Sequence, residues 1–98
     1  MSHIVDTIYY QLGGNKFRAM TGTHSFRAEG NYTLHMTLLK NKSGANHLKI
    51  FLNSLDLYDM TFSYISSKGI FVKSVHNNIY NDMLAATFTE VTGLNTSL

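Results

Sequence analysis

Residues 47–64 read HLKIFLNSLDLYDMTFSY, and this stretch decides the fold. It contains two runs in which every second residue is apolar, a period that is typical of strands with one buried face. The alternating positions are Leu48, Ile50, Leu52, Tyr58, Met60, Phe62 and Tyr64. Only a short connection through Leu55-Asp56-Leu57 joins the two runs. Parallel neighbours need a long crossover, so the sequence predicts an antiparallel pair of strands here.

The same alternation continues on both sides of this pair. Polar turns that contain Gly, Asn or Ser separate the runs, and short turns favour pairing between consecutive strands. The further predicted strands cover residues 16–20, 25–29, 32–38 and 70–76. The pattern therefore predicts an antiparallel β-meander of four to six strands.

A helix is predicted at each end of the chain, because apolar residues recur there every three to four positions. For the N-terminal helix, Ser2 is the expected cap and Gly13-Gly14 the expected end. For the C-terminal helix, Asn77 or Asn78 is the expected cap and Gly93 the expected end. The apolar stripes are Ile4, Val5, Ile8, Tyr9 and Leu12, and then Tyr80, Met83, Leu84, Thr87, Phe88 and Val91. The predicted fold is a single α+β domain over residues 1–98, with both helices on one face of the sheet.

The composition is that of a folded domain with few charges. Of the 98 residues, 44% are hydrophobic and 14% charged, and the formal net charge is +2 with His neutral. These values argue against disorder, and the net charge is low for a dedicated nucleic-acid binder. The absence of Cys excludes disulfides and thiolate metal sites. Because no apolar run reaches membrane-spanning length and no secretion signal is evident, we expect a cytoplasmic protein without membrane contact.

All eight Lys and Arg residues lie between Lys16 and Lys73, the window assigned to the sheet. If the strands turn their apolar positions inward, including Ile70 and Val72, the opposite face collects basic and aromatic residues. The predicted binding surface comprises Lys16, Arg18, His35, Lys49, Phe51, Phe71 and Lys73, together with Tyr10 from the N-terminal helix. Such a face could hold phosphates and stacked bases. A solvated or protein-binding sheet face explains the same residues.

The sequence shows no pattern for catalysis or for a cofactor. Gly13-Gly14 lacks the spacing of a phosphate-binding loop, and the five His residues form no His-x-His or His-x-x-x-His pair. Asp56 and Asp59 fall at a strand entrance, where Asp more often completes a turn than acts as an acid or base. We predict no enzyme activity, no metal and no cofactor. A zinc site assembled from separate strands and a small enzyme remain as alternatives.

Three stretches of the chain resemble a group of short phage and mobile-element proteins. They are Leu12 to Gly22 (LGGNKFRAMTG), Leu55 to Met60 (LDLYDM), and Ile79 to Leu84 (IYNDML) followed by Thr92-Gly93-Leu94. The resemblance runs from Gln11 to Leu98 and departs around residues 23–31 and 40–46. The group has no assigned activity, so no catalytic residue is carried over. The resemblance implies a phage-encoded accessory protein that works inside a bacterial cell.

The function predicted on this basis is non-catalytic binding of a protein partner, such as host nucleic-acid-processing or defence machinery. The alternative is direct binding of nucleic acid through Lys16, Arg18, Lys49 and Lys73. Self-association is a further alternative, because Phe51 and Phe71 would suit a dimer that packs sheet against sheet.

Overall fold

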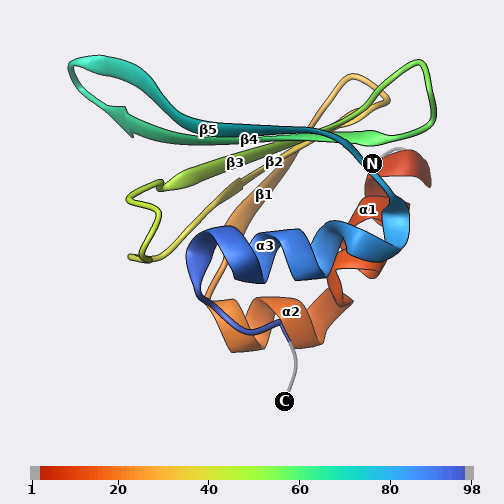
Figure 1. The fold of residues 1–98 in the computed structure, drawn as a ribbon, viewed down its shortest axis with the longest axis horizontal. Coiled ribbons are helices and arrows are strands. Elements are labelled where there is room, and N and C mark those ends of the chain that lie inside the picture. Colours follow the sequence, from red (N-terminus) through yellow and green to blue (C-terminus); the bar gives the residue numbers. More distant parts are fainter. Residues whose placement is uncertain (1–2, 97–98) are drawn as a thin grey trace.

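The computed structural model describes residues 3–96, and the expected cap Ser2 lies outside this range. A five-stranded antiparallel sheet packs against three helices (Figure 1). In chain order the elements are α1 (His3–Leu12), α2 (Gly14–Thr21), β1 (His24–Glu29), β2 (Thr33–Thr37), β3 (His47–Leu52), β4 (Tyr58–Ser66), β5 (Gly69–Ile79), the short 3-10 helix η1 (Asn81–Met83) and α3 (Leu84–Thr92). The prediction of an α+β fold built on an antiparallel meander is confirmed.

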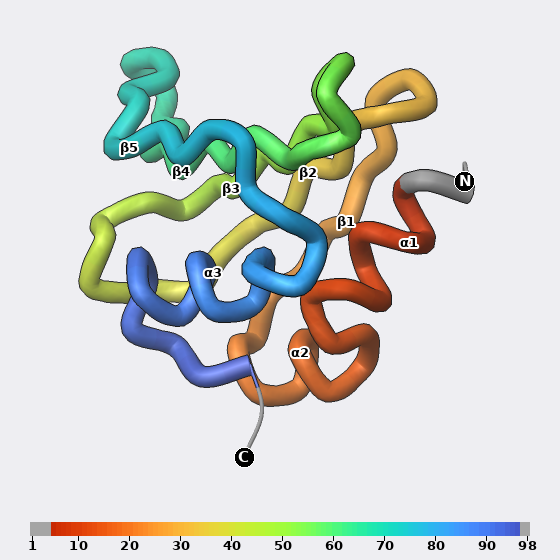
Figure 2. The backbone as a smooth tube through the Cα atoms, turned by 45° about the vertical axis from the view of Figure 1, so that its right-hand side comes forward, coloured from red at the N-terminus to blue at the C-terminus, as the bar shows by residue number. Residues whose placement is uncertain are grey.

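The strands lie in the order β1-β2-β3-β4-β5, so each strand pairs with its neighbour in the sequence. All four pairs are antiparallel. The helices lie on one side of the sheet, and none of the described helices lies on the other (Figures 1 and 2). We call the covered side the inner face and the opposite side the outer face.

The hydrophobic core lies between the inner face and the helices. The register aligns Leu34 with Ile50 and Met60, and Met36 with Leu48 and Phe62, across β2, β3 and β4. The helices supply Val5, Ile8, Leu12, Phe17, Leu84 and Phe88 to the same cluster. These twelve side chains are at most 1% exposed. Burying this apolar surface is the main term that holds the helical layer on the sheet.

Residues 16–20 form part of a helix, so the prediction of a strand there was wrong. Gly13 has φ 124° and Gly14 has φ 60°, values that residues with a Cβ seldom adopt. The first helix ends at Leu12, directly before these two glycines, so the predicted end is confirmed, and the glycines turn the chain into α2. Gly14, Phe17 and Thr21 are the buried residues of α2, which is a helical spacing. The Phe17 ring packs edge-on against Phe88 of α3, with centroids 4.9 Å apart.

β5 extends to Ile79, three residues beyond the predicted end of the last strand, and this delays the C-terminal helix. Asn77 and Asn78 therefore lie within β5 and do not cap the helix. Tyr80 and Met83 were predicted to lie on its apolar stripe, but they precede α3 and are exposed. The predicted stop is confirmed, because the residue after α3, Gly93, closes the helix with φ 77°.

Both edge strands, β1 and β5, carry irregularities. The register of β1 shifts between His24 and Arg27, where Ser25 has φ 58°. β5 holds an extra residue at Lys73, between the partners of Phe62 and Ser63, and another near Asn78. An extra residue reverses the side on which the following side chains point. Bulges of this kind also make an edge strand a poor template for another strand.

Candidate binding face

The outer face changes from basic to apolar between β1 and β5. One row of outward residues crosses all five strands: Arg27, His35, Lys49, Thr61 and Val75. A neighbouring row places His47 beside Ser63 and Val72. We call Arg27, His35, His47 and Lys49 the basic end, and Ile65, Ile70, Val72 and Val75 the apolar end. Thr61 lies between the two ends, and Phe51 lies on β3 two residues from Lys49, in the row of Thr33 and Asp59.

At the basic end, three side chains form a hydrogen-bonded chain. Glu29 Oε1 lies 2.6 Å from His35 Nε2, and His35 Nδ1 lies 3.0 Å from His47 Nε2. The side chain of His35 is only 11% exposed, whereas that of Glu29 is 64% exposed. The residues come from β1, β2 and β3, so sheet pairing alone positions them. We call this set the Glu29–His35–His47 chain.

The surroundings shift the pKa values at both ends of this chain. The hydrogen bond from His35, followed by the charge of that ring, lowers the pKa of Glu29 below its usual value of 4.5. Partial burial lowers the pKa of His47 below its usual value of 6.5, because burial disfavours the imidazolium. The charges of His35, Arg27 and Lys49 lower it further. The chain therefore resists full protonation.

Within the described part of the chain, Arg27 and Lys49 form no salt bridge, although their charges help to lower the pKa of Glu29. Among residues 3–96, the Glu29–His35 contact is the only ion pair. Arg27 and Lys49 flank His35 in the register from β1 and β3, and both are exposed. The basic end therefore presents two fixed cations that an external anion can reach.

The apolar end exposes side chains that sheets usually bury. Ile70 is 68% exposed, Val72 58% and Val75 51%. Beside Phe51, a hollow of about 310 Å³ opens between the β1–β2 turn and the β3–β4 loop. Tyr32 and Phe51 contribute aromatic surface to this hollow. This hollow is separate from the apolar end, whose exposed side chains Ile70, Val72 and Val75 are of the kind found at interaction sites.

The structure brings together only part of the predicted binding surface. His35, Lys49 and Phe51 share the outer face, whereas Lys16 and Arg18 lie on α2. Arg18 places its guanidinium 5.8 Å from the ring centroid of Phe26. Tyr10 lies apart from this face on α1 and is 78% exposed. Contrary to the expectation, Lys16 and Arg18 do not lie on the sheet, because the segment that contains them forms helix α2.

Phe71 and Lys73 also lie away from the outer face. Ile70 and Val72, expected to point inward, pair with Ile65 and Ser63 on the outer side. Phe71 pairs with Tyr64 and therefore takes the opposite side. Lys73 is the extra residue of the bulge, and its side chain passes Gly44 in the loop between β2 and β3. The bulge is thus the physical reason that both placements were wrong.

The Glu29–His35–His47 chain was missed because its members are far apart in the sequence. His35 and His47 are separated by twelve positions, and Glu29 precedes His35 by six. The usable signal was that His35 and His47 occupy polar positions on consecutive predicted strands. Whether two such residues meet depends on how the two strands are aligned. The alternation in the sequence does not give this register, whereas the folded β2–β3 pair shows it.

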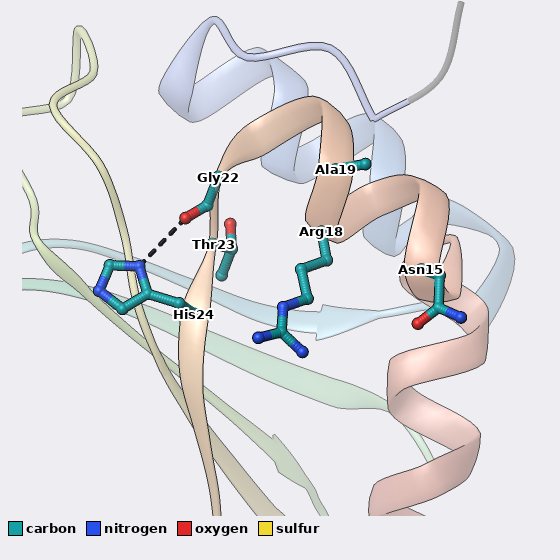
Figure 3. A pocket seen from close by; sticks show the side chains of 6 residues that line it. All are labelled: Asn15, Arg18, Ala19, Gly22, Thr23 and His24. Carbon is teal, nitrogen blue, oxygen red and sulfur yellow. Dashed lines mark hydrogen bonds between the residues drawn. The ribbon is translucent and has the colours of Figure 1, made fainter.

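A second hollow, of about 390 Å³, lies between α2 and the start of β1 (Figure 3). Its lining includes Asn15, Arg18 and Thr23, and His24 Nδ1 lies 3.1 Å from Gly22 O. No carboxylate lines this hollow, so it holds no acid–base pair of the kind that hydrolases use. It is an open, partly polar depression on the helical side of the molecule.

Within residues 3–96, no group of three or more His, Asp or Glu side chains is arranged to hold a metal ion. None of the helices described is long and apolar enough to cross a membrane. Comparisons of the chain with known protein families, curated proteins and solved structures found no match.

Proposed function

We propose that this chain is a small non-catalytic accessory protein that acts by binding a protein partner on its outer face. The observation that carries the proposal is the arrangement of that face. Unpaired Arg27 and Lys49 lie at one end, and exposed Val72 and Val75 lie at the other. Interfaces between proteins combine these two kinds of surface, with apolar area for affinity and charge for orientation. The resemblance to phage and mobile-element proteins supports an accessory role inside a bacterial host.

The edge strands favour docking on the face rather than strand addition. β5 is the longer edge strand, but bulges interrupt its hydrogen-bonding edge at two places. Lys73 lies at one of these bulges, and a charged bulge discourages pairing with another strand. A partner therefore gains most by covering the outward side chains of the sheet.

The proposal can be tested by changing each end of the face separately. One variant combines Arg27→Glu with Lys49→Glu, and another combines Val72→Ser with Val75→Ser. All four side chains are exposed, so stability should change by less than about 0.5 kcal/mol per substitution. The matched control is Lys16→Glu, which reverses a charge on α2. Thermal unfolding would confirm that every variant is folded.

Each variant would then serve as bait for capture of partners from bacterial lysate, with chemical crosslinking and mass spectrometry. We expect the same protein to be captured by the wild type and by Lys16→Glu, and to be lost from both outer-face variants. Capture that is identical for all baits would contradict the proposal. Light scattering would show whether the wild-type protein is a dimer and whether the Val72→Ser, Val75→Ser variant is a monomer. If both hold, the partner of the outer face is a second copy of this chain and not a foreign protein.

Direct nucleic-acid binding is the second candidate. The observation that favours it is the position of exposed Phe51 two residues from Lys49 on the same side of β3. A base could stack on Phe51 while Lys49 and Arg27 contact phosphates. Against it, Lys16, Arg18 and Lys73 lie elsewhere, so the face offers few phosphate contacts. Affinity for a single-stranded oligonucleotide that falls steeply with salt and vanishes in the Arg27→Glu, Lys49→Glu variant would establish this candidate.

A further inference from the structure

The Glu29–His35–His47 chain lies at the basic end of the outer face, the surface proposed to bind a partner, so its role in binding rests on the proposed function. An ionised carboxylate only accepts hydrogen bonds, and therefore His35 Nε2 donates to Glu29. The 3.0 Å contact between His35 Nδ1 and His47 Nε2 then requires one proton between two nitrogens. Either His47 donates to a neutral His35, or a charged His35 donates to a neutral His47. In both arrangements the two rings share a single proton.

A second charged ring is incompatible with this bond. If both imidazoles were protonated, two N–H groups would face each other across 3.0 Å. Arg27 on β1 and Lys49 on β3 flank His35 and add to the repulsion. The outward residues of β4 and β5 beside them are uncharged: Thr61, Ser63, Val72 and Val75. Asp59 of β4, which also lies on this face, accepts hydrogen bonds from Asn53 and the Asn78 amide.

We propose that the Glu29–His35–His47 chain is a proton-dependent switch that controls how strongly the basic end of the outer face attracts an acidic partner. The chain takes up one proton with its hydrogen bonds intact. A second proton separates the two rings, releases His47 toward solvent, and changes the chain from net neutral to net positive. The basic end then carries additional positive charge beside Arg27 and Lys49, and its attraction for carboxylates increases as the pH falls.

The same charges define the chemistry of the partner. Arg27 and Lys49 would bind carboxylates of the partner, whereas Val72 and Val75 would pack against its apolar side chains. Five strands spaced about 4.8 Å apart span roughly 19 Å, which about six extended residues can cross. The fitting partner is an extended acidic segment that continues into an apolar one and runs across the strands. Its acidic half would lie over the switch.

The first experiment tests the switch in the free protein. Nitrogen NMR of the imidazole rings reports tautomers and the scalar coupling across an N–H···N bond. Near neutral pH we expect a coupling between His35 Nδ1 and His47 Nε2, which is lost on acidification below the usual His47 pKa of 6.5. In His47→Gln this coupling should be absent, whereas His35 Nε2 should still donate to Glu29. Absence of the coupling in the wild type near neutral pH, or its persistence on acidification, would overturn the proposal, and this measurement needs no variant.

The second experiment measures binding of a synthetic peptide, glutamate-rich in its first half and leucine-rich in its second. Its control has lysine in place of glutamate. We expect affinity for the acidic peptide to rise roughly two- to tenfold between about pH 7.5 and pH 5.5, the range expected for one or two added surface charges. His47→Gln should reduce this ratio. His76→Gln should leave it unchanged, because the His76 ring packs against Phe62 and pairs with Met60 of the inner face.

The two proposals fail in distinguishable ways. If no partner depends on the outer face at any pH, the proposed function is wrong. If outer-face variants lose binding but affinity for the acidic peptide does not change with pH, the function stands and the switch does not regulate it. Preference for the lysine peptide would overturn the acidic chemistry assigned to the partner.

Discussion

Phe17→Ala should be one of the most destabilising single substitutions in this protein. The Phe17 side chain is fully buried, and its ring lies 4.9 Å from that of Phe88 at an interplanar angle of 73°. Truncating a buried Phe to Ala costs about 3–5 kcal/mol, because both transfer energy and a cavity are involved. A domain of this size has a total stability of about 5–15 kcal/mol. We expect the Phe17→Ala substitution to lower the free energy of unfolding by about 3–5 kcal/mol and to lower Tm by roughly 12 °C or more.

Urea unfolding followed by circular dichroism would measure the effect, with Lys16→Ala as the control. Lys16 neighbours Phe17 on α2 but is exposed, so its truncation should cost less than about 0.5 kcal/mol. A double-mutant cycle of Phe17→Leu and Phe88→Leu should give a coupling of about 0.5–1.5 kcal/mol for the aromatic pair. A cost for Phe17→Ala below about 1 kcal/mol, similar to that of Lys16→Ala, would refute the packing of α2 against α3.

Two further predictions concern backbone geometry and pH. Gly22→Ala and Gly30→Ala should each destabilise the protein, because both residues have positive φ. A Cβ at Gly22 would also meet the exposed Leu39 side chain, which can rotate away, whereas Gly30 has open space. The backbone strain costs about 1–2 kcal/mol at each site, so an unchanged stability on urea unfolding would contradict the left-handed conformations. The folded pKa of His47 is lowered, so the unfolded chain takes up its proton first. Its contribution to stability should be complete above about pH 6.5 and lost as the pH falls from there through the folded pKa. Thermal scans across this range should show a smaller decline for His47→Gln than for the wild type.

The parts of the fold that were predicted correctly depend on local patterns. β2, β3 and β4 follow a regular alternation, so their inner and outer residues could be assigned before the structure was known. The helical segment around Phe17 could not be recognised in this way. Its five residues also alternate, and their helical state depends on glycine conformations and on a contact with Phe88, which lies more than seventy positions away.

For the candidate site as well, the residues on regular strands were placed correctly, and those that depend on a bulge or on register were not. His35, Lys49 and Phe51 were placed on one face because their strands contain no bulge in the paired region. Phe71 and Lys73 were misplaced because one extra residue in β5 reverses the direction of its side chains. The contact between His35 and His47 required the register of two strands, which alternation alone does not supply.

The strand order has a consequence for how the chain folds. Each strand pairs with its neighbour in the sequence, so every hairpin closes only a short loop. The helical layer is different, because α1 and α3 come from opposite ends of the chain and meet over the sheet. We therefore expect the hairpins to form early and the joining of the two termini to come last. Until that last step, the inner face of the sheet is exposed to water, so a nascent chain still lacking α3 would be the form most prone to aggregate.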